Sequence, residues 1–303
     1  MAAELPLIAG LELGGTKCVA ILARGREVIA QKRFPTETPA ITLPALSAQI
    51  TAWAKSSGQI AALGIASFGP LVLDASHENY GFIADTVKPG WSHTDLLGHF
   101  RRQFDMPIGL DTDVAGAALA EMRWGAAIGC ADLVYLTIGT GVGGGVIAGG
   151  KPVQGWMHPE IGHMRVRRSS SDNFTGVCAF HGDCLEGLIS GPAITARTGQ
   201  PAETLAADHP VWIDVARELS EAIAILILTL SPKRILLGGS VALGNAHLLP
   251  AIRIRATELL AGYIAGLGKE EMRSVVAIAG LAELAGPLGA IAIGNDALIA
   301  DIA

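Results

Sequence analysis

Two cysteines and a histidine are evenly spaced in the segment GVCAFHGDCLEG, within a chain of 303 residues that has only four cysteines. Cys178, His181 and Cys184 supply three of the four nitrogen and sulfur ligands that a tetrahedral Zn²⁺ site requires. The upstream motif HPEIGH offers a fourth ligand, either His163 or His158. A disulfide between the two cysteines is the alternative, which a reducing compartment disfavours. The spacing therefore predicts a zinc site.

Two glycine-rich turns each carry a threonine. GLELGGTK ends in Gly-Thr-Lys rather than the Gly-Lys-Thr of a Walker loop, and TIGTGVGGG contains GxGxxG but continues as a strand, so neither opens a helix. Either turn alone can be a tight turn in which glycine supplies a positive φ. As a pair, with Thr16 and Thr140, they predict two hairpin turns that clamp a polyphosphate across a cleft with backbone N–H groups.

Asp111 and Asp113 stand where a strand is expected to end and a helix to begin, in LDTDVAGAALAE. One of the two is expected to cap the helix by accepting a backbone N–H bond. The other carboxylate, at the carboxyl end of a strand, can act as a general base toward a substrate hydroxyl.

The elements that must position these residues follow a repeated order. Short apolar runs at 7–13, 18–24 and 27–33 are separated by glycine turns, as in hairpin-linked strands. DLVYLTIGTGVGGGVIAGGKPVQG repeats this layout, so the sequence predicts two similar α/β lobes, each a three-stranded unit followed by helices. Further helices are expected at 40–56, from 113, at 184–198, 211–230, 246–262 and from 282, and further strands at 60–66, 106–110, 234–237 and 274–279.

Composition limits the class of partner. The formal net charge is −6 and no run of Lys and Arg exceeds two residues, so the basic surface of a nucleic-acid-binding protein is not expected. The apolar stretch AIAILILTL is far shorter than the roughly 20 residues that cross a bilayer, and it predicts a buried helix instead. The start MAAELPLIAG carries no export signal, so we expect a cytoplasmic protein with a small-molecule partner.

Taken together, these motifs make the chain resemble the ROK family of sugar kinases, and within it the bacterial fructokinase branch. The resemblance extends from about residue 7 to 290. The knuckle Cys-x-x-His-x-x-Cys points to the fructokinase branch, since most members have Cys-x-Cys-G-x-x-G-Cys. The segments that carry it are GLELGGTK, ASFGPL, VKPGW, DTDVAGAALAE, TIGTGVGGG, HPEIGH, CAFHGDCLEGLISGPAI and ILLGGSVA.

The resemblance implies an α/β fold of two actin-like, ribonuclease H-like lobes with a cleft between them. We expect the N-terminal lobe over residues 1–117, with a helix at 290–303 packing back on it, and the C-terminal lobe with the zinc knuckle over 118–289. A homodimer is the family expectation.

The resemblance also assigns roles to single residues. Asp113 matches the catalytic base, and Thr112, Glu160, His163 and Glu186 match positions that bind sugar hydroxyls. ATP would be held, with Mg²⁺, by the two turns and their neighbours, and Zn²⁺ by four ligands. The residues for ATP are Gly14, Gly15, Thr16, Lys17, Thr140, Gly141, Pro192, Gly238, Gly239 and Ser240, and those for Zn²⁺ are His163, Cys178, His181 and Cys184.

Three positions depart from the family pattern. Thr112 and Ala115 stand where many relatives have asparagine, which removes polar groups near the sugar. Glu12 stands where aspartate is commoner, and its longer carboxylate would reach Mg²⁺ through water.

We therefore expect ATP-dependent phosphorylation of a hexose, D-fructose at its 6-hydroxyl, with Asp113 as general base. The alternatives in the same family are a glucokinase, a mannokinase or an N-acetyl sugar kinase. A non-catalytic sugar-responsive regulator is the alternative from another class. It would need an N-terminal helix-turn-helix module, for which a strand beginning by about residue 7 leaves no room.

Overall fold

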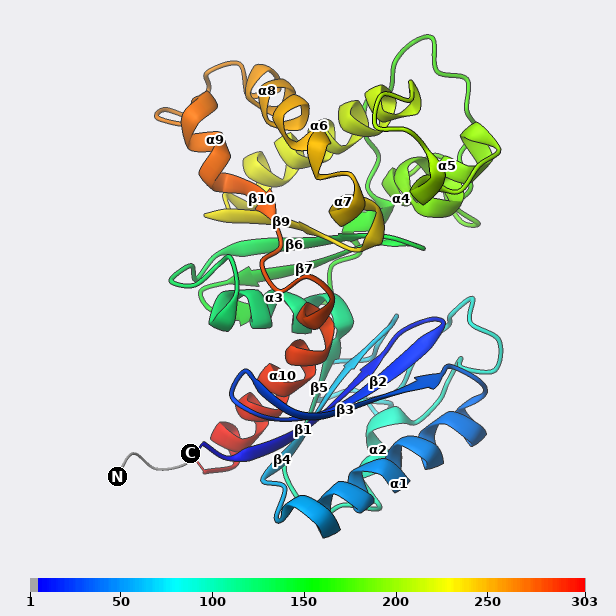
Figure 1. Ribbon diagram of the computed structural model, residues 1–303, viewed down its shortest axis with the longest axis vertical. Coiled ribbons are helices and arrows are strands. Elements are labelled where there is room, and N and C mark those ends of the chain that lie inside the picture. The colour runs from blue at the N-terminus through cyan, green and yellow to red at the C-terminus, as the bar shows by residue number, and fades with distance from the viewer. Residues whose placement is uncertain (1–4, 303) are drawn as a thin grey trace. The chain divides into compact units, whose positions relative to one another are not determined.

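The computed structural model describes residues 5–302 of the protein, which divide into two compact units. The first unit takes Met1–Trp124, Pro152–Pro159 and Glu283–Ala303, and the second takes Gly125–Lys151 and Glu160–Ala282. Each unit contains one five-stranded sheet with its own helices (Figure 1).

The sheet of the first unit consists of β1 (Leu7–Leu13), β2 (Lys17–Arg24), β3 (Glu27–Pro35), β4 (Ala62–Ser67) and β5 (Ile108–Thr112). Its order is β3-β2-β1-β4-β5, in which the first three strands of the chain pair antiparallel while β1, β4 and β5 run parallel. The apolar run of β1 lies buried in the centre of the sheet. β3 forms one edge of the sheet and is largely exposed.

Helices cover both faces of this sheet: α1 (Pro39–Ser57), α2 (Leu96–Arg101), α3 (Asp113–Trp124) and α10 (Ala285–Ile302). On one face, apolar side chains of α1 and α2 pack with alternate residues of β1 in a single core. On the other face, α10 lies against β1, β4 and β5 and packs against α3 (Figure 1). The C-terminal helix therefore completes the core of the N-terminal unit.

Helix α10 approaches the backbone of β4 directly. A Cβ on Gly64 would lie 1.8 Å from the carbonyl oxygen of Ala290, far inside van der Waals contact. Glycine is thus the residue that this helix-to-strand contact requires.

The second unit repeats the strand order of the first. Its strands are β6 (Leu133–Ile138), β7 (Val142–Ala148), β8 (Lys151–Pro152), β9 (Arg234–Gly238) and β10 (Val276–Ile278). They are arranged as β10-β9-β6-β7-β8, with β6 antiparallel to β7 and parallel to β9. In chain order within each unit, both sheets read 3-2-1-4-5, which confirms the predicted duplication and the two-lobed fold class.

The helices of the second unit are α4 (Leu185–Ile189), α5 (Gly191–Thr198), α6 (Val211–Leu230), α7 (Ser240–Gly244), α8 (Leu249–Leu260) and α9 (Lys269–Val275). The apolar stretch at 222–230 lies in α6, most of it buried up to Ile227, as predicted. No helix among residues 5–302 has the length and hydropathy needed to cross a membrane.

Three short helices of the structure were not expected from the sequence. They are α2, of six residues, α7, of five, and α9, of seven, and none of them is long enough to establish a helical repeat of apolar positions. Because α9 extends to Val275, the strand predicted at 274–279 begins only at Val276.

Candidate active site

Three loops of the first unit leave the same edge of its sheet. β1, β4 and β5 are parallel, and their last residues Leu13, Ser67 and Thr112 lie in register. The glycine turn after β1, the SFGP loop after β4 and the start of α3 after β5 therefore meet at this edge. Open α/β sheets bind ligands at the carboxyl ends of their strands. Parallel pairing thus brings together the predicted phosphate turn and Asp113.

The glycine turn after β1 directs its carbonyl groups toward protein partners. Gly14 O accepts from Thr36 Oγ1 (2.7 Å), Thr16 O accepts from Thr36 N (3.0 Å), and Gly15 O accepts from the ammonium group of Lys88. Among residues 5–302, the structure records no hydrogen bond from the backbone N–H of Gly15 or Thr16. The turn therefore offers two N–H groups to an anion.

Asp113 is the first residue of α3, and its carboxylate is not the helix cap. Thr112 Oγ1 accepts the N–H of Ala115 (3.1 Å), whereas Asp113 Oδ1 accepts from its neighbour Val114 N (2.9 Å). Thr112 is buried, and its hydroxyl oxygen supports the start of the helix. Burial raises the pKa of Asp113 to about 6. A carboxylate in this environment accepts a proton more readily than one in water.

Glu12 lies in the same electrostatic environment as Asp113. Burial raises the pKa of Glu12 to about 7, with a further contribution from the negative charge of Asp113, against the opposing charges of Lys17 and Arg33. A Cβ on residue 286 would lie 2.0 Å from Glu12 Oε1, so Gly286 leaves the space that this carboxylate occupies. Two close acidic groups with raised pKa values form a site that a cation would stabilise.

Asp111 anchors a neighbouring segment instead of capping the helix. Its Oδ2 accepts from Gln154 Nε2 (3.1 Å) and its Oδ1 accepts from Thr112 N (2.7 Å), while burial raises its pKa to about 6. The expectation that one of the two aspartates caps α3 was wrong, because Thr112 takes that role.

In the second unit, two loops leave one edge of the sheet in the same way. β6 and β9 are parallel and Thr137 lies in register with Gly238, so the second glycine turn and the loop that starts α7 lie at this edge. Ser240 Oγ lies 3.4 Å from the position that a Cβ on Gly139 would take. The predicted nucleotide residues Thr140, Gly141, Gly238, Gly239 and Ser240 are thus brought together.

The segment of α4 and α5 holds the second turn from the other side. Gly191 N, at the start of α5 beside Pro192, donates to Gly139 O (2.7 Å). Glu186 Oε2, in α4, accepts from Val142 N (3.1 Å). The predicted sugar ligand Glu186 is therefore also a support of the predicted phosphate turn.

Four predicted zinc ligands form a compact cluster in the second unit. One ligand atom from each of His163, Cys178, His181 and Cys184 lies within 4.8 Å of all the others. His158, the alternative fourth ligand, lies in the first unit, where its Nε2 accepts from Leu71 N (3.0 Å). The structure therefore selects His163.

The spacing of the cluster fits a tetrahedral zinc ion. His163 Nδ1 is 3.5 Å from Cys184 Sγ and 3.7 Å from Cys178 Sγ, which is itself 3.7 Å from His181 Nδ1. With usual bond lengths, a nitrogen and a sulfur ligand of tetrahedral Zn²⁺ lie about 3.5 Å apart. Burial raises the pKa of the Cys184 thiol to about 11, so a cation is needed to hold that group as a thiolate.

The other predicted sugar ligands lie next to this cluster. Glu160 precedes a short 3₁₀ turn, Ile161–His163, that carries the zinc ligand His163. Leu185 N donates to Met164 O (2.9 Å), which ties this turn to the start of α4 and so to Glu186.

The predicted site residues thus form one set in each unit. The first unit holds Gly14 to Lys17, Thr112 and Asp113, and all the others lie in the second unit. Lys88, whose ammonium group donates to the Gly15 carbonyl, was not among the predicted site residues. It lies in the VKPGW segment, for which the sequence predicted no separate role.

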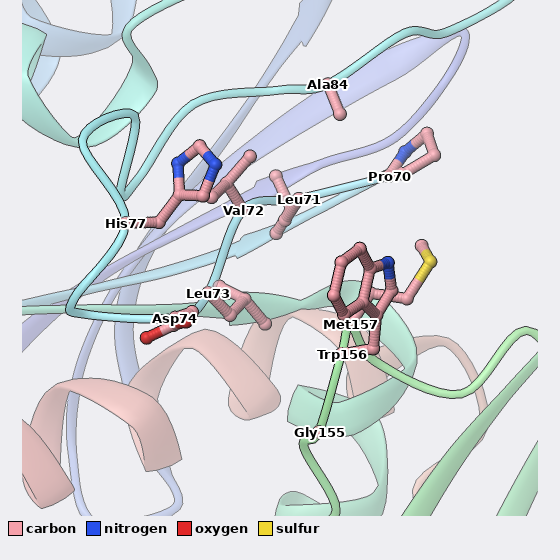
Figure 2. A pocket seen from close by; sticks show the side chains of 10 residues that line it. All are labelled: Pro70, Leu71, Val72, Leu73, Asp74, His77, Ala84, Gly155, Trp156 and Met157. Atoms are coloured by element: carbon pink, nitrogen blue, oxygen red, sulfur yellow. The ribbon is translucent and has the colours of Figure 1, made fainter.

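A separate pocket of about 530 Å³ lies in the first unit (Figure 2). In this view His77 and Asp74 lie on one side, and Trp156 and Met157 on the other. The indole of Trp156 is fully exposed. Asp113 is not among the lining residues, so this pocket does not contain the candidate base.

Comparison with known proteins identifies the family to which the chain belongs. The sequence pattern of the ROK family matches residues 8–297. The fructokinase of Zymomonas mobilis subsp. mobilis is 39% identical over 93% of this chain and 94% of its own length. A putative fructokinase of Bacillus subtilis is 42% identical over 78% of this chain and 77% of its own length.

A solved structure supports the same relationship. The ROK hexokinase from Thermus thermophilus superposes with a TM-score of 0.78 at 27% identity, over 98% of this chain and all of that one. Since the family pattern spans nearly the whole chain and the relatives named above exceed 30% identity over most of it, the protein belongs to the ROK family.

Proposed function

We propose that the protein catalyses the ATP-dependent phosphorylation of a hexose, D-fructose at its 6-hydroxyl, with Asp113 as the general base. The similarity to fructokinases at 39% and 42% identity supports the choice of sugar. The observation that carries the mechanism is the carboxylate of Asp113, which lies at the carboxyl end of β5, free of the capping role and with a pKa of about 6.

The chemical step requires one proton transfer and one phosphoryl transfer. The sugar 6-hydroxyl gives its proton to Asp113 as the oxygen attacks the γ-phosphorus of ATP. The bond from that phosphorus to the β,γ-bridging oxygen breaks, and ADP leaves with the electron pair. A base with a pKa near 6 is largely ionised at neutral pH and still accepts the proton as the oxygen becomes acidic. The products are the sugar 6-phosphate and ADP.

The rest of the rate comes from positioning and from neutralising charge on the phosphates. In the first unit, the backbone N–H groups of Gly15 and Thr16 bind phosphate oxygens, with Lys17 beside them. In the second unit, the turn around Thr140 and Gly141 contributes in the same way. Mg²⁺ would neutralise the charge of the β- and γ-phosphates, and Glu12 would hold it next to Asp113, where the raised pKa values fit a cation.

Sugar recognition falls to the residues around the zinc cluster. The hexose hydroxyls form hydrogen bonds with Glu160, His163, Glu186 and Thr112. His163, Cys178, His181 and Cys184 would hold Zn²⁺, which takes no part in the chemistry. Bound there, the ion would tie the 3₁₀ turn to the start of α4, so that Glu160, His163 and Glu186 keep one geometry.

A panel of hexoses tests the choice of substrate. The assay couples ADP release to NADH oxidation and gives kcat/KM for fructose, glucose, mannose and N-acetylglucosamine. We expect fructose to be preferred over each of the others by at least about tenfold, corresponding to one or two well-placed hydrogen bonds. A higher kcat/KM for glucose or mannose would overturn the assignment of fructose while leaving the sugar-kinase activity in place.

A further inference from the structure

The segment VKPGW is fixed in place next to the first glycine turn. Its Trp91 is fully buried in the core of the first unit, and the indole Nε1 donates to Glu37 O (2.7 Å). Phe68, in the SFGP loop, packs edge-on against the same indole with ring centroids 5.2 Å apart. These contacts hold Lys88, three residues earlier, over the turn.

The ammonium group of Lys88 contacts two carbonyl oxygens. It donates to Gly15 O and, at 3.4 Å, to Thr36 O. Thr36 is the residue that also holds the carbonyl groups of Gly14 and Thr16. Lys88 and Thr36 together therefore engage three successive carbonyl groups of the turn.

Because the peptide bond is planar, these contacts to carbonyl oxygens also orient the N–H groups of Gly15 and Thr16. In a trans peptide the carbonyl oxygen and the N–H of the next residue point in opposite directions. Lys88 on Gly15 O therefore directs the N–H of Thr16 away from the protein, as Thr36 on Gly14 O does for the N–H of Gly15. These are the two N–H groups for which residues 5–302 provide no partner.

The charge of Lys88 adds to this orientation. A bond from an ionised donor is shorter and about twice as strong as a neutral one, and it polarises the peptide that accepts it. The N–H of Thr16 becomes a better donor as a result. The ammonium also contributes positive charge behind a turn that faces a polyphosphate.

We propose that Lys88 is a positioning residue for nucleotide phosphates, acting through the Gly15–Thr16 peptide. It does not touch the reacting atoms, because it binds the carbonyl side of the turn. The inference rests on the proposed kinase function for its substrate, ATP, but its geometry concerns the first unit alone.

Three variants of Lys88 distinguish a role in orienting the Gly15–Thr16 peptide from a general loss of structure in the first unit. Lys88→Met removes both donor and charge, and we expect it to weaken ATP binding about tenfold, as loss of a charged hydrogen bond would. Lys88→Arg restores a charged donor and should return binding to within about threefold of the unaltered protein. Lys88→Gln keeps an uncharged donor on a shorter side chain, and we expect a loss between the other two.

The measurement is calorimetric titration with ATP and with AMP in the absence of sugar, together with KM for ATP and for sugar. For Lys88→Met we expect weaker binding of ATP and a higher KM for ATP. The affinity for AMP and the KM for sugar should stay within about twofold of the values of the unaltered protein. Lys55→Met, at the exposed end of α1, is the matched control for loss of one positive charge, and it should leave all four values unchanged.

Two results would overturn the inference. One is ATP binding by Lys88→Met and Lys88→Gln that equals that of the unaltered protein. The other is an equal loss for AMP and ATP, which would mean that the variants damage the unit as a whole. Because the titration uses no sugar, a protein that binds ATP but phosphorylates no hexose would contradict the proposed function and still test Lys88.

Discussion

At the scale of single residues, the task of Asp113 depends on its neighbour Thr112. The hydroxyl of Thr112 caps α3, so the carboxylate that follows does not serve as the cap, although it accepts the N–H of Val114. Its burial raises its pKa to about 6, toward the working pH of a general base. Thr112 thus leaves the aspartate available for the proton transfer that we propose.

The raised pKa of Asp113 predicts the pH dependence of the reaction. The active form is the carboxylate, so kcat/KM should be level above about pH 7 and fall as the pH drops through about 6, approaching tenfold per pH unit. The measurement is kcat/KM for the sugar at saturating ATP between about pH 5 and 8, which covers the titration and the level region above it.

Asp113→Asn is the control for this profile. The amide oxygen can still accept the N–H of Val114, so the fold should persist, while kcat falls by about 10²–10⁴ because no base remains. Sugar affinity, measured by calorimetry, should stay within about threefold. Turnover near that of the unaltered protein, or an unchanged fall in activity near pH 6, would rule out Asp113 as the base.

At the scale of elements, the contact between α10 and the first sheet depends on small residues. The backbone of α10 lies on β4 where Gly64 faces Ala290, and the same helix leaves room for Glu12 at Gly286. The C-terminal helix therefore supports the fold and also shapes the space around an acidic group of the site.

Gly64→Ala should destabilise the first unit. A methyl group would lie 1.8 Å from Ala290 O, so α10 must shift, and overpacking of this kind costs more than about 2 kcal/mol. Urea unfolding monitored by circular dichroism measures the loss. The matched control is Gly244→Ala, where a Cβ meets nothing within 4 Å, and we expect a change below about 0.5 kcal/mol there. Equal effects at both positions would contradict the close contact.

At the scale of the whole molecule, each of the two units has its own sheet, and the proposed zinc site belongs to the second unit alone. The ligands come from the 3₁₀ turn at Ile161–His163 and from the irregular segment that leads into α4. A metal that joins such segments supplies stability that their few backbone hydrogen bonds do not.

Removal of the metal should therefore loosen one unit and spare the other. After treatment with a chelator, we expect faster hydrogen exchange in residues 160–189 and unchanged protection in β1 and β4. Cys184→Ser should give the same pattern, lose bound zinc, and raise KM for sugar more than KM for ATP.

Cys130→Ser is the matched control, because Cys130 is a free cysteine outside the cluster. It should bind zinc and exchange like the unaltered protein, and added zinc should reverse the effect of the chelator. Faster exchange in both units alike would contradict a metal that acts locally. Loss of zinc with an unchanged KM for sugar would mean that the cluster stabilises the fold but does not position the sugar ligands.

Much of the architecture could be predicted because it depends on local sequence patterns. The apolar runs around the two glycine turns fixed three strands in each unit, and their repetition predicted the duplication that the two sheets show. The short helices α2, α7 and α9 were missed, since five to seven residues give too few apolar repeats. The chain order of the strands is local information, but their pairing across the sheet is not.

The amino-acid sequence by itself predicted the types of the four candidate zinc ligands and the chemistry that we propose for the site, because these predictions depend on residue type and spacing. Tertiary structure alone selected His163 over His158, gave the capping role to Thr112, and brought Lys88 to the turn at Gly15. The physical reason is that these outcomes depend on contacts between segments that are far apart in the sequence. Such contacts follow from the parallel pairing of strands and from the packing of Trp91, and residue spacing along the chain does not determine them.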